Sequence, residues 1–108
     1  MQRSFQLTLS SGSTVYNLYT LMQSIGVPTD GILPDRVNQF AIQFDVSNGT
    51  ANLFVGDSAL STSNYGTKLT AGDSMGAGPT FGNGICLRDY YVLSDTAGTK
   101  INIIINSI

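Results

Sequence analysis

The sequence predicts an all-β protein: a two-sheet, jelly-roll-like β-sandwich of about seven or eight strands with one short N-terminal helix. First, several short runs alternate apolar and polar residues, as strands with one buried face do. Second, Gly, Asp, Asn and Ser separate these runs, and these residues favour turns. Third, all seven acidic residues are Asp, which favours turns and caps, and none is Glu, which favours helices.

Length and charge limit what the chain can do. Its 108 residues suit a single domain spanning residues 1–108. The net charge is -2 and the five basic residues are scattered, so no basic stripe is present for a nucleic-acid backbone. No apolar run approaches the roughly 20 residues of a membrane-spanning helix, and no secretory signal is recognisable. We therefore expect no nucleic-acid or membrane partner, and synthesis in the cytoplasm.

An alternating run opens the chain. Phe5, Leu7 and Leu9 alternate with polar residues, which predicts a strand with one buried face. Residues 29–35 are rich in Pro, Asp and Gly, which favour turns over regular structure. We therefore expect residues 1–35 to form an N-terminal arm or a helical segment that a hinge connects to the rest of the domain.

The one helix is predicted over residues 15–25, where apolar residues fall at helical spacing. Ser13 or Thr14 can cap its start, and Gly26 followed by Pro28 can end it. The segment VYNLYTL within this range also suits a strand, because Val and Tyr are common in strands.

The clearest alternation in the chain is the run QFAIQFDV, residues 39–46, which predicts a strand with one apolar face. Asn48 and Gly49 follow this run. This pair is typical of a type I′ hairpin turn, in which both central residues adopt positive φ. The sequence therefore predicts a hairpin whose second arm is formed by residues 51–55.

Residues 53–75 place two short apolar runs on either side of a polar loop that is rich in turn residues. The triplet GDS occurs twice, at residues 56–58 and 72–74, and each copy is predicted to form a turn. A short strand is expected between them, at residues 67–70.

The last third of the chain predicts one loop and two strands. The Gly-rich residues 76–84 are expected to form an exposed loop. Strands are expected at residues 90–94 and 100–106. An Ile-rich strand fits the middle of a sheet, or an edge that a neighbouring subunit covers. One face of this last strand carries Ile101, Ile103 and Ile105.

The search for catalytic chemistry is negative. The chain contains no His, the commonest general base and a frequent metal ligand. Cys86 fits a small buried apolar residue better than a reactive thiol. Asp57 and Asp73 fit turns better than a carboxylate pair for acid–base chemistry or calcium. The Gly-rich segment lacks the Lys of a phosphate-binding loop. We expect no enzymatic activity, no cofactor and no metal.

The order of segments resembles the small β-sandwich virion proteins of tailed bacteriophages, most closely the jelly-roll capsid decoration, or cement, proteins. The resemblance covers residues 39–105. It rests on QFAIQFDV, then NLFVGDSALSTSN and GTKLTAGDS, then a Gly-rich loop, then LRDYYVLSDTAGTKINIII.

The resemblance implies a homotrimer that binds the major capsid protein on the outer capsid surface and strengthens the head against internal DNA pressure. Contacts with the capsid are then expected through the N-terminal segment, at Phe5, Leu7 and Leu9. The subunit interface is expected on the last strand. Its predicted residues are Ile103, Ile105 and Ile108.

Two other classes of function remain open. A carbohydrate-binding or tail-fibre or baseplate module would share the sandwich and expose a tyrosine for stacking on a sugar. The candidates are Tyr65, Tyr90 and Tyr91, and the last two point to opposite faces of one strand. An enzyme would need a pair of Asp residues in a cleft.

Overall fold

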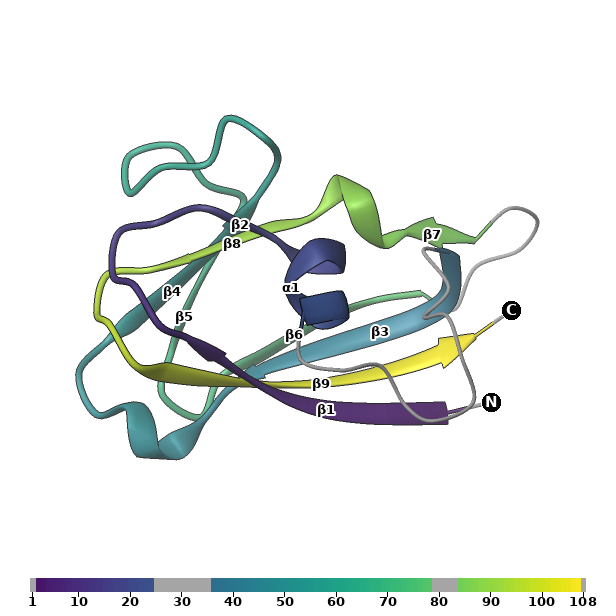
Figure 1. Ribbon diagram of the computed structural model, residues 1–108, viewed down its shortest axis with the longest axis horizontal. Helices are drawn as coiled ribbons and strands as arrows, with labels where there is room; N and C mark the ends of the chain where they lie inside the picture. Colours follow the sequence, from purple (N-terminus) through teal and green to yellow (C-terminus); the bar gives the residue numbers. More distant parts are fainter. Residues whose placement is uncertain (1, 25–35, 79–83, 108) are drawn as a thin grey trace.

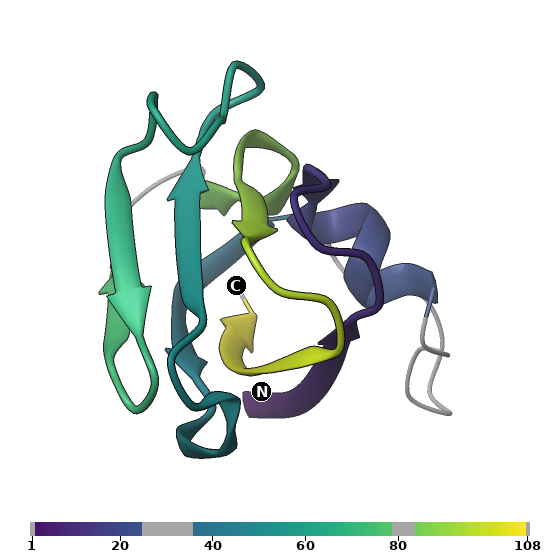
Figure 2. The same ribbon diagram turned by 90° about the vertical axis from the view of Figure 1, so that its left-hand side faces the viewer.

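The structure is a computed structural model that describes residues 2–24, 36–78 and 84–107. Two antiparallel sheets pack face to face, with one short helix at their side (Figures 1 and 2). Two 3-10 turns lie at Val46–Asn48 and Leu87–Asp89. The elements are β1 (Gln2–Leu9), β2 (Tyr16–Asn17), α1 (Leu18–Ser24), β3 (Arg36–Phe44), β4 (Asn52–Gly56), β5 (Thr67–Thr70), β6 (Ser74–Ala77), β7 (Ile85–Cys86), β8 (Tyr91–Ser94) and β9 (Thr99–Ser107).

The strand order is that of a jelly roll. One sheet has the order β1-β9-β3-β6, with β7 also paired to β3, and the other has the order β2-β8-β4-β5. The chain therefore passes repeatedly from one sheet to the other, and its first and last strands lie side by side. Apart from β7, eight strands of the described chain form two four-stranded antiparallel sheets, which is the arrangement of a jelly-roll sandwich. The predicted fold class is confirmed.

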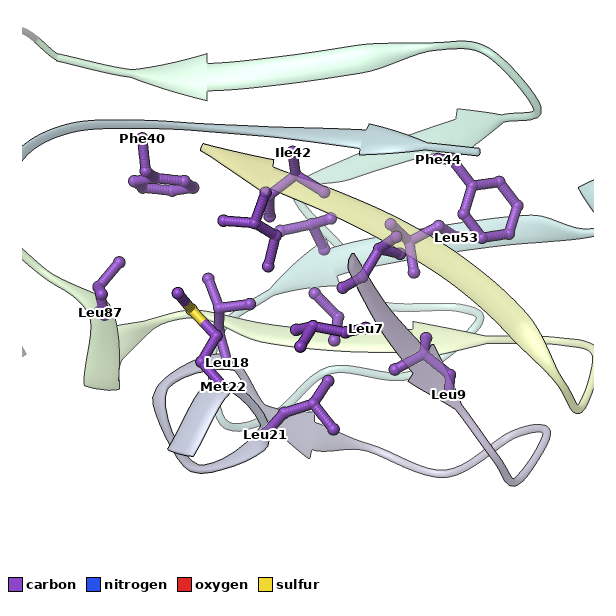
Figure 3. Close-up of a cluster of buried hydrophobic side chains, with 14 of the residues drawn as sticks. Leu7, Leu9, Leu18, Leu21, Met22, Phe40, Ile42, Phe44, Leu53 and Leu87 are labelled. Carbon is purple, nitrogen blue, oxygen red and sulfur yellow. The ribbon is translucent and has the colours of Figure 1, made fainter. Parts of the chain in front are cut away.

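The core lies between the two sheets and follows the alternation of the sequence (Figure 3). On β9, the side chains of Ile101, Ile103 and Ile105 are fully buried, and β9 lies between β1 and β3. Phe40 and Ile42 of β3 face the same core. Burying a side chain of this size stabilises a fold by roughly 1.5 to 3 kcal/mol, so these positions hold the sheets together.

The helix α1 covers the side of the sandwich between β1 and β2, and it buries Leu18 and Met22 against the core (Figures 2 and 3). Its cap differs from the prediction. The side chain of Asn17 accepts a hydrogen bond from the backbone N–H of Thr20 at 3.0 Å. Ser13 instead lies in a turn, where its backbone N–H donates to the carbonyl of Ser94. The helix starts late because Tyr16–Asn17 first pairs with β8.

The predicted hairpin at Asn48 and Gly49 is wrong, because β3 and β4 lie in different sheets. Both sides of β3 are already occupied, by β9 on one side and by β6 and β7 on the other. No side remains for β4. Gly49 does have a positive φ of 65°, but its ψ of -119° is not that of a type I′ turn. The Asn48 side chain instead binds both backbone groups of Lys100, at 2.8 and 2.9 Å.

The Gly-rich segment begins as a strand, not as a loop. Gly76 pairs with Ala41 of β3, and a Cβ atom on Gly76 would lie 3.1 Å from the carbonyl oxygen of Phe40. Gly78 has a φ of +96°, and a Cβ there would lie 2.4 Å from the carbonyl oxygen of Asn38. The remaining predicted loop residues, 79–83, lie outside the described residues, as does the predicted hinge.

Candidate functional site

Three surface regions carry groups that can bind a ligand or a partner: the aspartate-containing turns, the outer face of the β1-β9-β3-β6 sheet, and the hollows beside the β4–β5 loop. No group of three or more potential metal-ligating side chains occurs in the part of the chain that the structure describes. Nor does any helix of that part have the length and apolar character needed to cross a membrane.

The aspartates hold turns together, as predicted for both GDS triplets. Asp57 accepts a hydrogen bond from the backbone N–H of Ala59 at 2.9 Å. Asp73 accepts from both the backbone N–H and the hydroxyl of Thr70, at 3.0 and 2.7 Å. These bonds stabilise the ionised carboxylate and so lower the pKa of Asp73, the hydroxyl bond having the larger effect. The two carboxylates serve different turns and do not form an acid–base pair.

Asp45 has the same structural role at the end of β3. The hydroxyl of Ser47 and the side-chain amide of Asn102 donate hydrogen bonds to its carboxylate. These two donors, in that order of effect, lower the pKa of Asp45 to about 2. The carboxylate is thus kept ionised in order to connect β9 to the turn after β3, and it is not tuned for proton transfer near neutral pH.

The outer face of the β1-β9-β3-β6 sheet carries a row of side-chain amides. Gln6 donates to Asn102 at 3.0 Å, and Asn102 donates to Gln43 at 3.1 Å, so the row crosses β1, β9 and β3. A second amide pair joins Asn106 to Gln39 at 3.4 Å. These contacts order polar side chains across the face, and Asn102 also donates to the ionised carboxylate of Asp45 at 2.9 Å.

Ile104 is the apolar residue at the centre of this outer face. It is 44% exposed, and the register places Ser4 of β1 on one side of it and Ala41 of β3 on the other. Because both neighbours are small, Ile104 remains accessible, and a shallow hollow of about 400 Å³ borders it. A surface of side-chain amides around one exposed aliphatic side chain can bind a protein surface through apolar contact and hydrogen bonds.

A second candidate lies in the loop between β4 and β5. Tyr65 is 44% exposed and meets the ring of Phe54 edge-on, with 4.9 Å between ring centroids. A hollow of about 230 Å³ beside it is also lined by Asp57 and Asn64. An aromatic ring next to a carboxylate and an amide is a combination that suits a sugar, which offers an apolar face and several hydroxyls.

A larger hollow of about 530 Å³ adjoins the Tyr65 hollow and shares Asp57 with it. It lies between the β4 and β5 side of the sandwich and the short strand β7. Cys86 lines it and is half-buried, so the interpretation of this thiol as a fully buried residue needs correction. Tyr90 also lines it, with its ring packed edge-on against Phe40 at 4.8 Å.

The residues predicted to form contacts are mostly in the core. Ile103 and Ile105 are 0% exposed within the single chain, so their side chains fill the sandwich and present no surface to a second subunit. Ile108 lies outside the described residues. The outward residue that the prediction missed is Ile104. The signal was present in the sequence, because Ile104 alternates with the three buried isoleucines.

The predicted capsid-contact residues need the same correction. Leu7 and Leu9 are fully buried, and Phe5 is half-buried and packs against the core. These residues belong to β1, which is a strand of the sandwich and not a separate arm. Their neighbours Ser4, Gln6 and Thr8 are exposed.

The fold defines this protein as an all-β, jelly-roll-like sandwich with shallow surface hollows and turns stabilised by aspartate. A search with protein-family models found no match for the chain, and a search of curated proteins found none either.

Proposed function

We propose that this chain is a structural protein of a bacteriophage virion, a capsid decoration (cement) protein that binds the outer capsid surface as an oligomer and stabilises the head. Three features support the proposal: the resemblance of residues 39–105, the jelly-roll strand order, which is common in capsid proteins, and the role of the aspartates in turns. A fourth observation carries most weight: on the outer face of the β1-β9-β3-β6 sheet, side-chain amides surround the exposed Ile104.

In this proposal the outer face is the surface that meets the major capsid protein. Ile104 supplies the apolar contact, and the amides of Gln6, Asn102 and Gln43 supply hydrogen bonds around it. The affinity of such a contact is modest for one copy. Several copies joined in an oligomer bind together with a much higher effective concentration, so the head is held without any strong single site. The protein is made in the host cytoplasm and acts on the outside of the capsid.

Co-sedimentation with undecorated capsids of the phage that encodes the protein tests this proposal. The wild-type chain is expected to sediment with the capsids, and Ile104→Asp is expected to lose at least about tenfold in affinity, because it buries a charge in the contact. Val46→Asp is the matched control, since Val46 is also exposed but lies in the turn after β3. Absence of wild-type binding, or equal binding by Ile104→Asp, would contradict the proposal.

A second candidate function rests on Tyr65. We propose carbohydrate binding, as in a tail-fibre or baseplate module, as the alternative, because Tyr65 is the exposed one of the three candidate tyrosines. Tyr90 packs on Phe40, and Tyr91 packs against the buried cluster around Phe54. A glycan screen followed by titration of Tyr65→Ala tests it, with Val46→Ala as the control. If no glycan binds the wild-type chain, this alternative is excluded.

A further inference from the structure

Within residues 2–24, 36–78 and 84–107, the strand β1 is paired on one side only. It lies at the edge of its sheet, and its one paired strand in this part of the chain is β9 (Figure 1). The carbonyl of Leu9 accepts a hydrogen bond from Gly98, which shows that the backbone groups of Leu9 point towards β9. Backbone groups alternate in direction along a strand, so those of Ser4, Gln6 and Thr8 point away from β9. They have no hydrogen-bond partner within the described ranges.

The other edges of the two sheets are protected in ordinary ways. The edge strands β2 and β7 have two residues each, and β5 and β6 have four each. The edge strand β5 also carries the exposed Lys68. Proteins commonly block unwanted strand pairing with short edges, lysines, prolines and bulges. By contrast, β1 has eight residues, contains no proline, and pairs with β9 without a register shift.

We propose that β1 pairs in an antiparallel manner with β1 of a second copy of this chain, about a twofold axis at Gln6. In this register Gln6 lies opposite Gln6 of the second copy, and Ser4 lies opposite Thr8 of the second copy. All three residues direct their backbone groups towards the partner strand, so each pair exchanges hydrogen bonds. The open backbone groups of β1 are thereby satisfied by an identical strand.

The side chains of β1 are compatible with this pairing. A twofold axis brings like residues close together, and Ser4, Gln6 and Thr8 carry no charge that would repel its copy. Arg3 is the single charged residue of β1, and the register places it opposite Leu9 of the second copy. Phe5 is half-buried in one chain. In the pair it lies opposite Leu7 of the second copy, which reduces the solvent exposure of its side chain.

The pairing also extends the surface that the proposed function uses. The amide row from Gln43 through Asn102 ends at Gln6, which is the residue on the twofold axis. The rows of the two copies therefore meet, and the two outer faces form one continuous sheet surface. The pairing of β1 with β1 is argued from the strand edge alone and does not depend on a role in a virion. Its twofold symmetry predicts a dimer, whereas the resemblance to decoration proteins implies a trimer.

Light scattering over a range of concentration tests the pairing. The wild-type chain is expected to have about twice the chain mass of 11.5 kDa. Gln6→Pro is expected to reduce the mass to that of one chain, because proline removes an N–H that only the second copy uses. Gln6→Ala, the matched control, keeps the N–H and should remain a dimer. A monomeric or trimeric wild type, or a folded dimeric Gln6→Pro, would overturn the proposal.

A charge series tests the register without proline. Ser4→Lys combined with Thr8→Lys places lysines opposite each other across the axis and should weaken dimerisation by roughly tenfold or more. Ser4→Glu combined with Thr8→Lys places opposite charges in the same positions and should restore it. Gln43→Lys puts a charge on the same face but away from the edge, and should leave the dimer intact. Equal dissociation constants for the two double variants, or dissociation by Gln43→Lys, would overturn the pairing, with circular dichroism confirming that each variant is folded.

Discussion

At the scale of single residues, Ile103 and Ile104 are neighbours with opposite environments. Ile103 is fully buried between the sheets, and Ile104 is 44% exposed on the outer face. The difference follows from the alternation of side chains along β9, so one position contributes to stability and the next contributes to the surface. Substitutions at these two positions therefore separate folding from binding.

We predict that Ile103→Ala lowers the free energy of unfolding by about 2 to 5 kcal/mol, because it leaves a cavity in the core. Ile104→Ala is expected to cost about 1 kcal/mol or less, since its side chain is partly in water. Urea denaturation followed by circular dichroism measures both. Equal losses at the two positions would contradict the burial of Ile103 that the structure shows.

The carboxylate of Asp45 gives a pH-dependent prediction. Its pKa in the fold is about 2, below its ordinary value of 3.8, chiefly because Ser47 and Asn102 donate hydrogen bonds to it. A lowered pKa stabilises the fold above pH 3.8, and this contribution is lost as the pH falls towards 2. Asp45→Asn should therefore show a smaller fall in Tm than the wild type between pH 4 and pH 2.

The control for this experiment is Asp89→Asn, because the Asp89 carboxylate accepts no hydrogen bond from the described residues. Thermal unfolding is recorded for all three proteins at each pH in the same buffer series. If Asp45→Asn follows the wild-type curve over the whole range, the hydrogen bonds of Asp45 do not contribute to acid stability.

At the scale of elements, α1 depends on a residue from the strand before it. The side chain of Asn17 accepts from the N–H of Thr20 and donates to the carbonyl of Arg88 at 2.8 Å. It therefore caps the helix and also fastens it to the 3-10 turn that precedes β8. The sequence predicts the helix but places its cap at Ser13 or Thr14, because the pairing of Tyr16 with Val92 joins residues that are distant in sequence.

We predict that Asn17→Ala destabilises the protein by about 1 to 2 kcal/mol, through the lost cap and the lost hydrogen bond to the carbonyl of Arg88. Thr14→Ala is the matched control. The Thr14 hydroxyl only donates to the nearby carbonyl of Gly12 at 3.3 Å, so the change should be within about 0.5 kcal/mol. Chemical denaturation compares the two. A larger loss for Thr14→Ala would restore the original cap prediction.

At the scale of the whole molecule, the buried residues of both sheets and of α1 form one main cluster. A shared core makes the two sheets unfold together, because neither keeps its apolar face covered alone. We predict a single cooperative transition in which tyrosine fluorescence and far-UV circular dichroism coincide. Two separate midpoints would show that the sheets unfold independently.

The sequence predicted much of the fold and little of the surface. Alternation identified the strands around Leu7, Phe40 and Ile103 and the faces that they bury, because period-2 patterning is a local property. The interface assignments rested on the same local pattern: Leu7 and Ile103 are apolar, but the structure buries both side chains within one chain. The open edge of β1 was not visible, since the state of an edge depends on which strands pair.

By itself, the sequence determined the positions of the strands around Leu7, Phe40 and Ile103, the turns held by Asp57 and Asp73, and the all-β class. These features depend on residues that lie within a few positions of one another. Only the tertiary structure decided that Asn48 turns the chain from one sheet to the other and does not close a hairpin. Both sides of β3 pair with strands that are distant in sequence. Which strands satisfy the backbone hydrogen bonds of β3 therefore depends on long-range contacts, and a local sequence pattern cannot predict them.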